Sequence, residues 1–193
     1  MRSLYALNQI NADTIVVPSS ARLVARLVTS SPRFNPSHLA TPPPKFTIPQ
    51  SNTTTVPIVP IQLAHVLEDI TMSPEFTPLT FEFTQPNLPP ATGRHLTTAV
   101  PLTSTRPVLA VAFWWDLTLH PTLPHVIFTH PASFQDHWPQ CLYVFPDHEV
   151  VEGVEGEVVY VTAYHDDEKV SKDANIVHSS TINQICRCDC SRT

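Results

Sequence analysis

The chain has 193 residues, of which 42% are hydrophobic and 15% charged, and its formal net charge is −6. This length predicts one domain with room for a substantial hydrophobic core. The chain contains 21 prolines but only 3 glycines, Gly93, Gly153 and Gly156. Loops that bind nucleotides need closely spaced glycines, because the backbone must approach a phosphate or ribose without a Cβ in the way. The composition therefore excludes a dinucleotide fold, a P-loop and a glycine-rich AdoMet-binding turn.

Charge and hydropathy exclude further classes of partner. The 17 acidic residues outnumber the 11 basic ones, which argues against nucleic acid, since phosphate binding requires clustered lysine and arginine. No apolar run approaches the roughly 20 residues that span a bilayer, and the N-terminus lacks a signal-peptide core, so we expect no membrane partner. The cysteines, Cys141 and a C-terminal group, do not form a secreted disulfide framework. We expect a soluble protein of a reducing, intracellular compartment.

The first half of the chain alternates short regular segments with proline-rich sequence. Residues 1–13 carry apolar side chains at a spacing of three, which indicates the last turns of a helix. Residues 21–29 alternate like a strand with one side in water, residues 61–70 fit either a strand or two helical turns, and residues 79–83 alternate like a strand.

Proline dominates the segment from Pro32 to Pro90, which holds 13 of the 21 prolines. This density favours extended conformations and disfavours long helices and central strands. We interpret the segment as a linker or surface insertion, with an SH3-type or WW-type ligand as the alternative.

Four strand-like runs rich in β-branched and aromatic residues follow Arg94. Turn signals separate them, so the pattern predicts an antiparallel sheet or barrel. The runs are Val108–Leu119, Val126–His130, Gln140–Pro146 and Glu157–His165.

Two groups of polar residues resemble catalytic or metal sites but do not fit the required geometry. His120, His125 and His130 recur every five residues, a spacing that places no two imidazoles on one face, so we interpret them as loop and strand-end histidines. Asp166 and Asp167 are adjacent and would point to opposite faces of an extended chain, so we expect a solvated turn rather than a catalytic pair.

The C-terminal cysteines form a candidate metal site. Cys186, Cys188 and Cys190 alternate along the sequence CRCDC, and thiolates at this spacing can share one zinc ion or a redox bond. Because no second pair of ligands is evident, these residues would supply half of a zinc site.

The strongest candidate for a binding loop is Asp136, His137 and Trp138, immediately before a buried aromatic strand. Loop side chains next to a rigid strand are well placed to face a partner. The alternative is that Trp138 fills the core and His137 is its hydrogen-bonded neighbour.

Three stretches carry a family resemblance: AFWWDLTL, DHWPQCLYVFP and AYHDD. They resemble the C-terminal β-barrel of protein arginine methyltransferases, most closely the first module of the two-module, monomethylating (type III) member. The resemblance implies an all-β, antiparallel β-barrel over residues 14–185. It further implies a Pro-rich insertion at about 32–78 in place of the dimerisation arm, and makes residues 1–13 the tail of an AdoMet-binding domain. Residues 186–193 become a Cys-rich end resembling a segment that contributes to a zinc site.

The same resemblance implies roles for the candidate residues. Asp136, His137 and Trp138 correspond to the family's Thr-His-Trp loop, which forms one wall of the pocket for the substrate arginine. The family binds S-adenosyl-L-methionine through a domain that precedes the barrel, so this chain would be an inactive fragment of an enzyme that monomethylates protein arginine. Its expected partners are arginine-containing protein substrates and the missing AdoMet domain or second module, in the cytoplasm or nucleus. The alternative is a non-catalytic binding or scaffold module that docks a partner through the Pro-rich insertion.

Overall fold

In a computed structural model the regular structure is almost entirely antiparallel strand, which confirms the all-β prediction. The structure describes residues 13–36, 58–83, 94–123, 125–133, 139–145, 150–165 and 175–177. Within these ranges the strand pairings form three sheets, and no pairing joins them into one closed ring. The expected helical tail and much of the Pro-rich segment lie outside the described residues.

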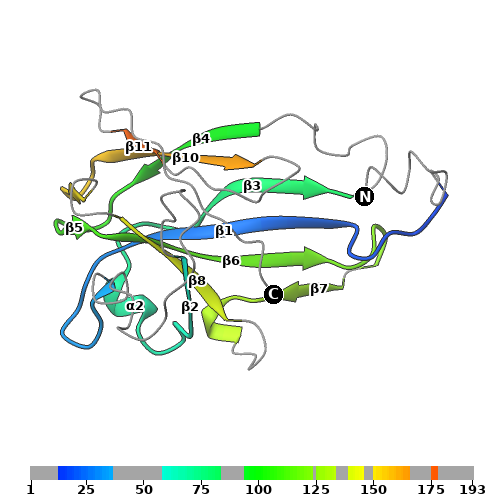
Figure 1. Ribbon diagram of the computed structural model, residues 1–193, viewed down its shortest axis with the longest axis horizontal. Coiled ribbons are helices and arrows are strands. Elements are labelled where there is room, and N and C mark those ends of the chain that lie inside the picture. Colours follow the sequence, from blue (N-terminus) through cyan, green and yellow to red (C-terminus); the bar gives the residue numbers. More distant parts are fainter. Residues whose placement is uncertain are drawn as a thin grey trace, which may run out of the picture.

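The largest sheet has six strands, with β2, β8, β6, β1 and β3 in that order and β7 pairing with β6 beside β8 (Figure 1). Its centre is the antiparallel pair β1 and β6, which stays in register from Ser20 opposite Thr118 to Val28 opposite Ala110. The strands are β1 (Ser20–Val28), β2 (Ile58–Ile61), β3 (Phe76–Glu82), β6 (Ala110–Thr118), β7 (Val126–Phe128) and β8 (Gln140–Val144).

The remaining strands form two smaller sheets. One contains β4 (Arg94–Pro101), β10 (Val158–His165) and β11 (Asn175–Val177), and the other pairs β5 (Pro107–Val108) with β9 (Val151–Glu152). The pair β4 and β10 lies beside β3 (Figure 1), and both strands contact β3.

The main core is built from side chains that alternate along these strands. Leu23, Ala25 and Leu27 of β1 are at most 1% exposed, and they belong to one cluster with Val159 and Val161 of β10. Successive residues of a strand point to opposite faces, so this cluster occupies the face of the large sheet that lies toward β10.

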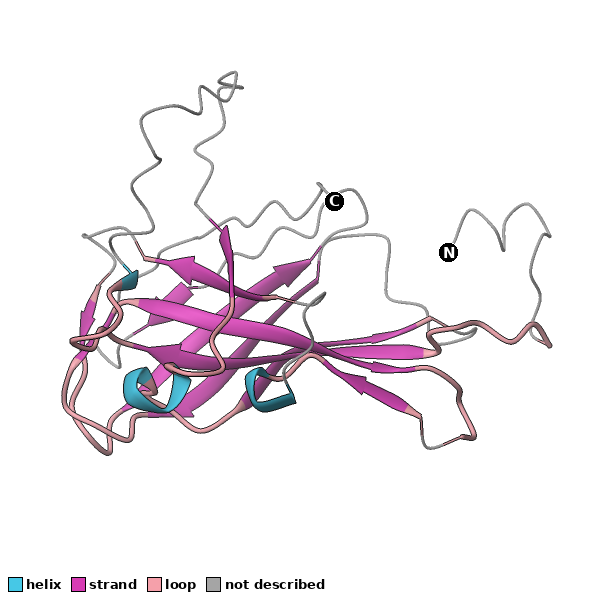
Figure 2. Ribbon diagram, turned by 90° about the horizontal axis from the view of Figure 1, so that it is seen from below, coloured by secondary structure: helices cyan, strands magenta, loops and turns pink. Residues whose placement is uncertain are grey.

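A second apolar cluster covers part of the opposite face of the large sheet. Val24 and Val28 of β1 and Trp114 of β6 pack there with Leu67 and Ile70 of the short helix α2 (Leu67–Ile70). Figure 2 shows α2 against this side of the strands. Among the described residues, no helix has the length and apolar character needed to cross a membrane.

The expectation that one side of β1 is in water is therefore only partly correct. Val24 is 3% exposed because it is covered from the α2 side, whereas the side chain of Arg22, on the same face, is 54% exposed. The burial of this face depends on a segment about forty residues further along the chain, which local alternation does not reveal.

The proline-rich region contributes directly to the large sheet. Residues 61–70, which fit either strand or helix, contain both: β2 ends at Ile61 and α2 begins at Leu67. Pro60 in β2 and Pro78 in β3 lie on the two edge strands, where a residue without an N–H can be accommodated. The division of the chain into a barrel and an insertion at about 32–78 stays a prediction.

Candidate functional site

The candidate binding loop is described through the two segments that flank it. Asp136, His137 and Trp138 themselves lie outside the described residues. Before them come β7 and the 3-10 helix η2 (Pro131–Ser133), and after them comes β8, beginning at Gln140. The described structure therefore shows how the base of this loop is held.

Gln140 is the central residue of that base, and only 2% of its surface is exposed. Its Nε2 donates to the carbonyl of Thr129 at 2.9 Å, and its Oε1 accepts from the N–H of Leu63 at 3.0 Å. One side chain thus joins the segment before the loop, the segment after it and the segment that leads into α2.

Thr129 fixes the incoming segment to the large sheet. Its N–H donates to the carbonyl of Trp115 at 3.0 Å, while its Oγ1 accepts from the N–H of Trp115 at 2.9 Å. Because Thr129 is only 4% exposed, these bonds form away from water and continue the pairing of β7 with β6.

His130 adds a third anchor next to η2. Its Nδ1 accepts from the N–H of Ala132 at 2.9 Å, which leaves Nε2 as the protonated nitrogen that donates to Oε1 of Glu75 at 3.0 Å. The ring meets Trp114 edge-on, with the ring centroids 5.0 Å apart and the planes at 90°. The same oxygen of Glu75 also accepts from Nη2 of Arg26 at 3.1 Å.

The sequence did not predict Gln140 or His130 as positioning residues. One signal was available for Gln140: it shares the alternation of Leu142 and Val144, so a polar side chain falls at a buried position. For His130 no local pattern was informative, because Glu75 and Trp114 come from separate strands or loops.

Two groups of residues were considered as metal ligands, the three histidines and the three C-terminal cysteines. In the described part of the chain no group of three or more histidine, cysteine or carboxylate side chains could hold a metal ion. His120 accepts hydrogen bonds from Thr122, two residues further on. Cys186, Cys188 and Cys190 lie outside the described residues, so the zinc half-site stays a prediction.

The chain's glycines do not fit an AdoMet site. A Cβ on Gly153 would lie 2.7 Å from Leu102 Cδ1 and 2.8 Å from the carbonyl oxygen of Arg106, so close packing already occupies the space. Gly156 has φ +86° and lies in the turn before β10. Gly93, the third glycine, is far from both in sequence, and a glycine-rich cofactor loop cannot be assembled from these three.

The comparison with protein families identifies the class. The model of the arginine methyltransferase oligomerization subdomain matches residues 46–181, which is more than half of the chain. The chain belongs to this family, in agreement with its antiparallel strands and the stretches around the candidate loop.

Individual relatives agree with this assignment. Protein arginine N-methyltransferase 7 of Bos taurus is 32% identical over 105 residues, covering 46% of this chain and 14% of that protein. The same enzyme of Gallus gallus is 29% identical over 94 residues, covering 40% of this chain and 13% of that protein. The chain thus spans about a seventh of the length of these relatives.

A solved structure shares the fold. The Trypanosoma brucei PRMT1 enzyme-prozyme heterotetrameric complex with AdoHcy matches with a TM-score of 0.59 and 14% identity. The match covers 97% of this chain and 62% of that chain. At this identity the likeness establishes the fold alone.

Proposed function

We propose that this chain is the barrel part of an AdoMet-dependent enzyme that transfers a single methyl group to arginine side chains of proteins. The observation that carries the proposal is the match of residues 46–181 to an arginine methyltransferase subdomain. The matched relatives are named as protein arginine N-methyltransferases, and the trypanosome complex was solved with AdoHcy. AdoMet would be held by a part of the enzyme outside this chain, since the glycines present here do not fit it.

In this proposal the barrel supplies one wall of the pocket for the substrate arginine. Trp138 would offer a flat ring to the guanidinium, and His137 would pair with an acidic group of the catalytic domain. Methyl transfer needs the reacting atoms held at about 3 to 3.5 Å, so a wall residue must be placed accurately. The bonds of Gln140, Thr129 and His130 support this role because they fix both ends of the loop.

Two further features complete the proposal. Cys186, Cys188 and Cys190 would contribute to a zinc site shared with another part of the enzyme. The family name refers to oligomerization and the trypanosome protein is part of a heterotetrameric complex, so we also propose assembly with another copy or module.

The test uses a chimera in which residues 14–185 replace the matching segment of the bovine relative. We expect Trp138→Ala to lower kcat/KM for a peptide rich in glycine and arginine by about tenfold or more, because the ring wall is lost. His137→Ala should lower it as well, while Val154→Ala, an exposed position outside the loop, should leave it unchanged.

Thermal melting of each variant separates loss of activity from loss of folding. If both loop variants melt like the parent chimera and keep its full kcat/KM, the proposed role of the loop is wrong. A parent chimera that is folded and binds AdoMet but cannot methylate would instead favour the non-catalytic scaffold module.

A further inference from the structure

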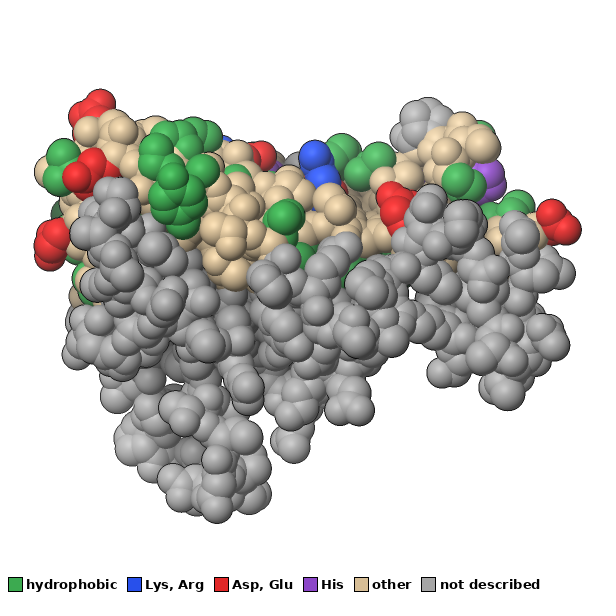
Figure 3. Space-filling model, turned by 90° about the horizontal axis from the view of Figure 1, so that it is seen from above, with side chains coloured by type: hydrophobic (Ala, Val, Ile, Leu, Met, Phe, Trp, Pro, Cys, Tyr) green, Lys and Arg blue, Asp and Glu red, His purple; other side chains and the backbone are tan. Residues whose placement is uncertain are grey.

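The described surface carries more acidic than basic charge, and its basic residues are largely engaged. Nine acidic and five basic residues lie within the described ranges. Arg22 and Arg26 form ion pairs, and Arg106 donates to the backbone carbonyls of Asp69 and Thr71. On the face in Figure 3, acidic side chains lie at both ends and basic side chains are few. This balance favours a cationic partner.

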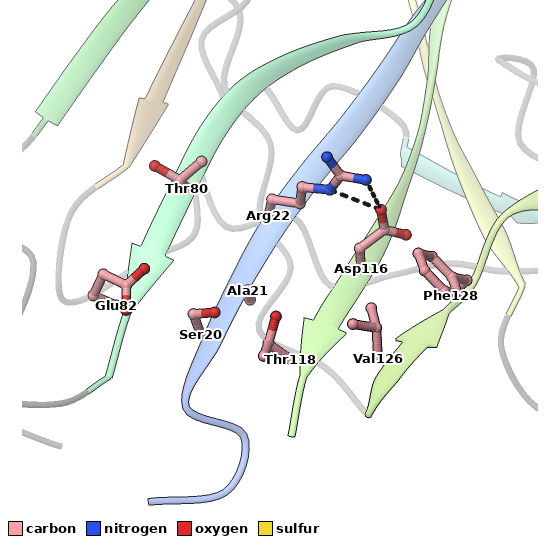
Figure 4. A pocket seen from close by; sticks show the side chains of 9 residues that line it. All are labelled: Ser20, Ala21, Arg22, Thr80, Glu82, Asp116, Thr118, Val126 and Phe128. Carbon is pink, nitrogen blue, oxygen red and sulfur yellow. Dashed lines mark hydrogen bonds and ion pairs between the residues drawn. The ribbon is translucent and has the colours of Figure 1, made fainter. Parts of the chain in front are cut away.

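One hollow on this surface lies outside the candidate loop. It has a volume of about 380 Å³ and is formed where β1, β3, β6 and β7 meet (Figure 4). Arg22 of this hollow lies on the same face of β1 as Val24, which belongs to the cluster with α2. Its charged and apolar lining includes Arg22, Glu82, Asp116, Val126 and Phe128.

Asp116 is the unusual residue of this hollow. Its side chain is 7% exposed, and its Oδ2 accepts from Nε and Nη2 of Arg22 at 2.8 and 2.7 Å. The other oxygen, Oδ1, is buried without a hydrogen-bond partner and lies on the side toward Phe128 (Figure 4). A buried acceptor without a donor is costly, so this oxygen is suited to receive an N–H from a ligand.

The rest of the hollow suits a flat cation. Phe128 is 45% exposed and Val126 is 37% exposed, and both project from β7 beside Asp116. Glu82, exposed on β3, adds a second carboxylate to the lining. An aromatic face next to carboxylate oxygens matches a guanidinium, which is planar and carries five N–H donors. An anion is disfavoured here, because Arg22 is already paired with Asp116 and the two carboxylates would repel it.

We propose that this hollow binds an arginine side chain of a partner protein, with the guanidinium against Phe128 and an N–H donated to Oδ1 of Asp116. Because Oδ1 is closed to water, binding requires a rearrangement of the side chains around it, and Phe128, which lies on that side, is 45% exposed. The inference rests on the proposed function for the identity of the partner, which in that proposal is the protein substrate of the methyltransferase. The arginine held here is a different one from the arginine that is methylated, so the hollow selects proteins with several arginines.

The experiment is a calorimetric titration of the full 193-residue chain with a peptide rich in glycine and arginine. Matched peptides carry lysine or glutamine in place of arginine. We expect Phe128→Ala to weaken binding of the arginine peptide about fivefold, and Glu82→Gln to weaken it and reduce its salt dependence. Val154→Ala and Glu155→Gln, an exposed apolar and an exposed acidic control, should bind like the unaltered chain. Phe128 and Glu82 are both exposed, so we expect these variants to fold. Asp116→Asn is not used, because Asp116 is buried and its ion pair with Arg22 would be lost.

Stronger binding of the arginine peptide than of the lysine peptide, with the loss in Phe128→Ala, supports the proposal. Equal binding of the two cationic peptides, or unchanged affinity in Phe128→Ala, overturns it. The titration contains no AdoMet and leaves His137 and Trp138 intact. A negative titration therefore concerns the hollow alone, and the proposed function is tested by the chimera assay. An inactive chimera, in turn, does not change the result of the titration.

Discussion

Gly153 and Gly156 lie close together in sequence but require the absence of a Cβ for different reasons. At Gly153 the space is filled by Leu102 and by the backbone of Arg106, and its N–H donates to the Arg106 carbonyl at 3.1 Å. At Gly156 nothing lies within 4 Å of a Cβ, but φ is +86°. One position is limited by packing and the other by backbone conformation.

Alanine at each position should therefore destabilise by a distinct mechanism. We expect Gly153→Ala to lower the free energy of unfolding by about 1 to 3 kcal/mol through overpacking against backbone. Gly156→Ala should cost about 1 kcal/mol through the left-handed conformation, and Gly156→Asn less, because asparagine tolerates this region. Urea unfolding measures all three. A neutral Gly153→Ala would contradict the close contact with Arg106.

Gln140 should matter through its two hydrogen bonds rather than its volume. We expect Gln140→Met, which keeps the size of the side chain, to cost about 2 to 4 kcal/mol, because the Leu63 N–H and Thr129 carbonyl lose their partner. Urea unfolding gives the stability, and the chimera assay gives the effect on the loop. Exposed Thr122→Ala is the control. A Gln140→Met chain as stable as the parent would show that the base of the loop is held in another way.

The helix α2 has only four residues, yet it covers part of the face of the large sheet opposite the main core. A helix this short is not stable in isolation, so it depends on the packing of Leu67 and Ile70 with Val24 and Trp114. Arg26 also pairs with Glu68 of the helix, but the side chain of Glu68 is 84% exposed.

The relative weight of apolar packing and ion pairing at α2 can be measured. We expect Ile70→Ala to cost about 2 to 5 kcal/mol, because Ile70 is fully buried. Glu68→Ala should cost less than about 1 kcal/mol, since an exposed ion pair is weakened by solvent and salt. If urea unfolding shows that Glu68→Ala lowers the free energy of unfolding as much as Ile70→Ala does, the ion pair with Arg26 is what stabilises the helix.

The sequence predicted the strands whose own residues carry the signal. The runs at 108–119, 126–130, 140–146 and 157–165 are rich in β-branched and aromatic residues, and each contains an observed strand. It did not predict β4, which carries Thr97, Thr98 and Pro101, and in which Val100 is deeply buried. The polar threonines and the terminal proline interrupt the apolar alternation that predicts a half-buried strand, and the strand is established by its pairing with β10.

The candidate site residues stay a prediction from the sequence, and the hydrogen bonds that hold the segments on either side of them could not be predicted. Asp136, His137 and Trp138 were identified by their position before β8 and by family resemblance. The side chain of Gln140 reaches partners 11 and 77 residues away, and His130 reaches Glu75 across 55 residues. These long-range hydrogen bonds depend on how the strands assemble, and the local pattern of apolar and polar residues does not predict that assembly.

In the described part of the molecule, prolines and glycines occupy positions with different structural demands. The prolines in the strands of the large sheet occur on its edge strands, β2 and β3, where a residue without an N–H can be accommodated. Gly153 lies in close packing and Gly156 in a turn, and in our proposal AdoMet is bound by another part of a longer enzyme. The chain accordingly spans about a seventh of the relatives that it matches.

In our proposal this chain works as the barrel of an enzyme that monomethylates protein arginine. The most direct measurement is mass spectrometry of a peptide rich in glycine and arginine after incubation with AdoMet and the chimera that carries residues 14–185. We predict monomethylarginine without dimethylarginine. If a folded, AdoMet-binding chimera leaves the peptide unmodified, or produces dimethylarginine, the proposed function is wrong.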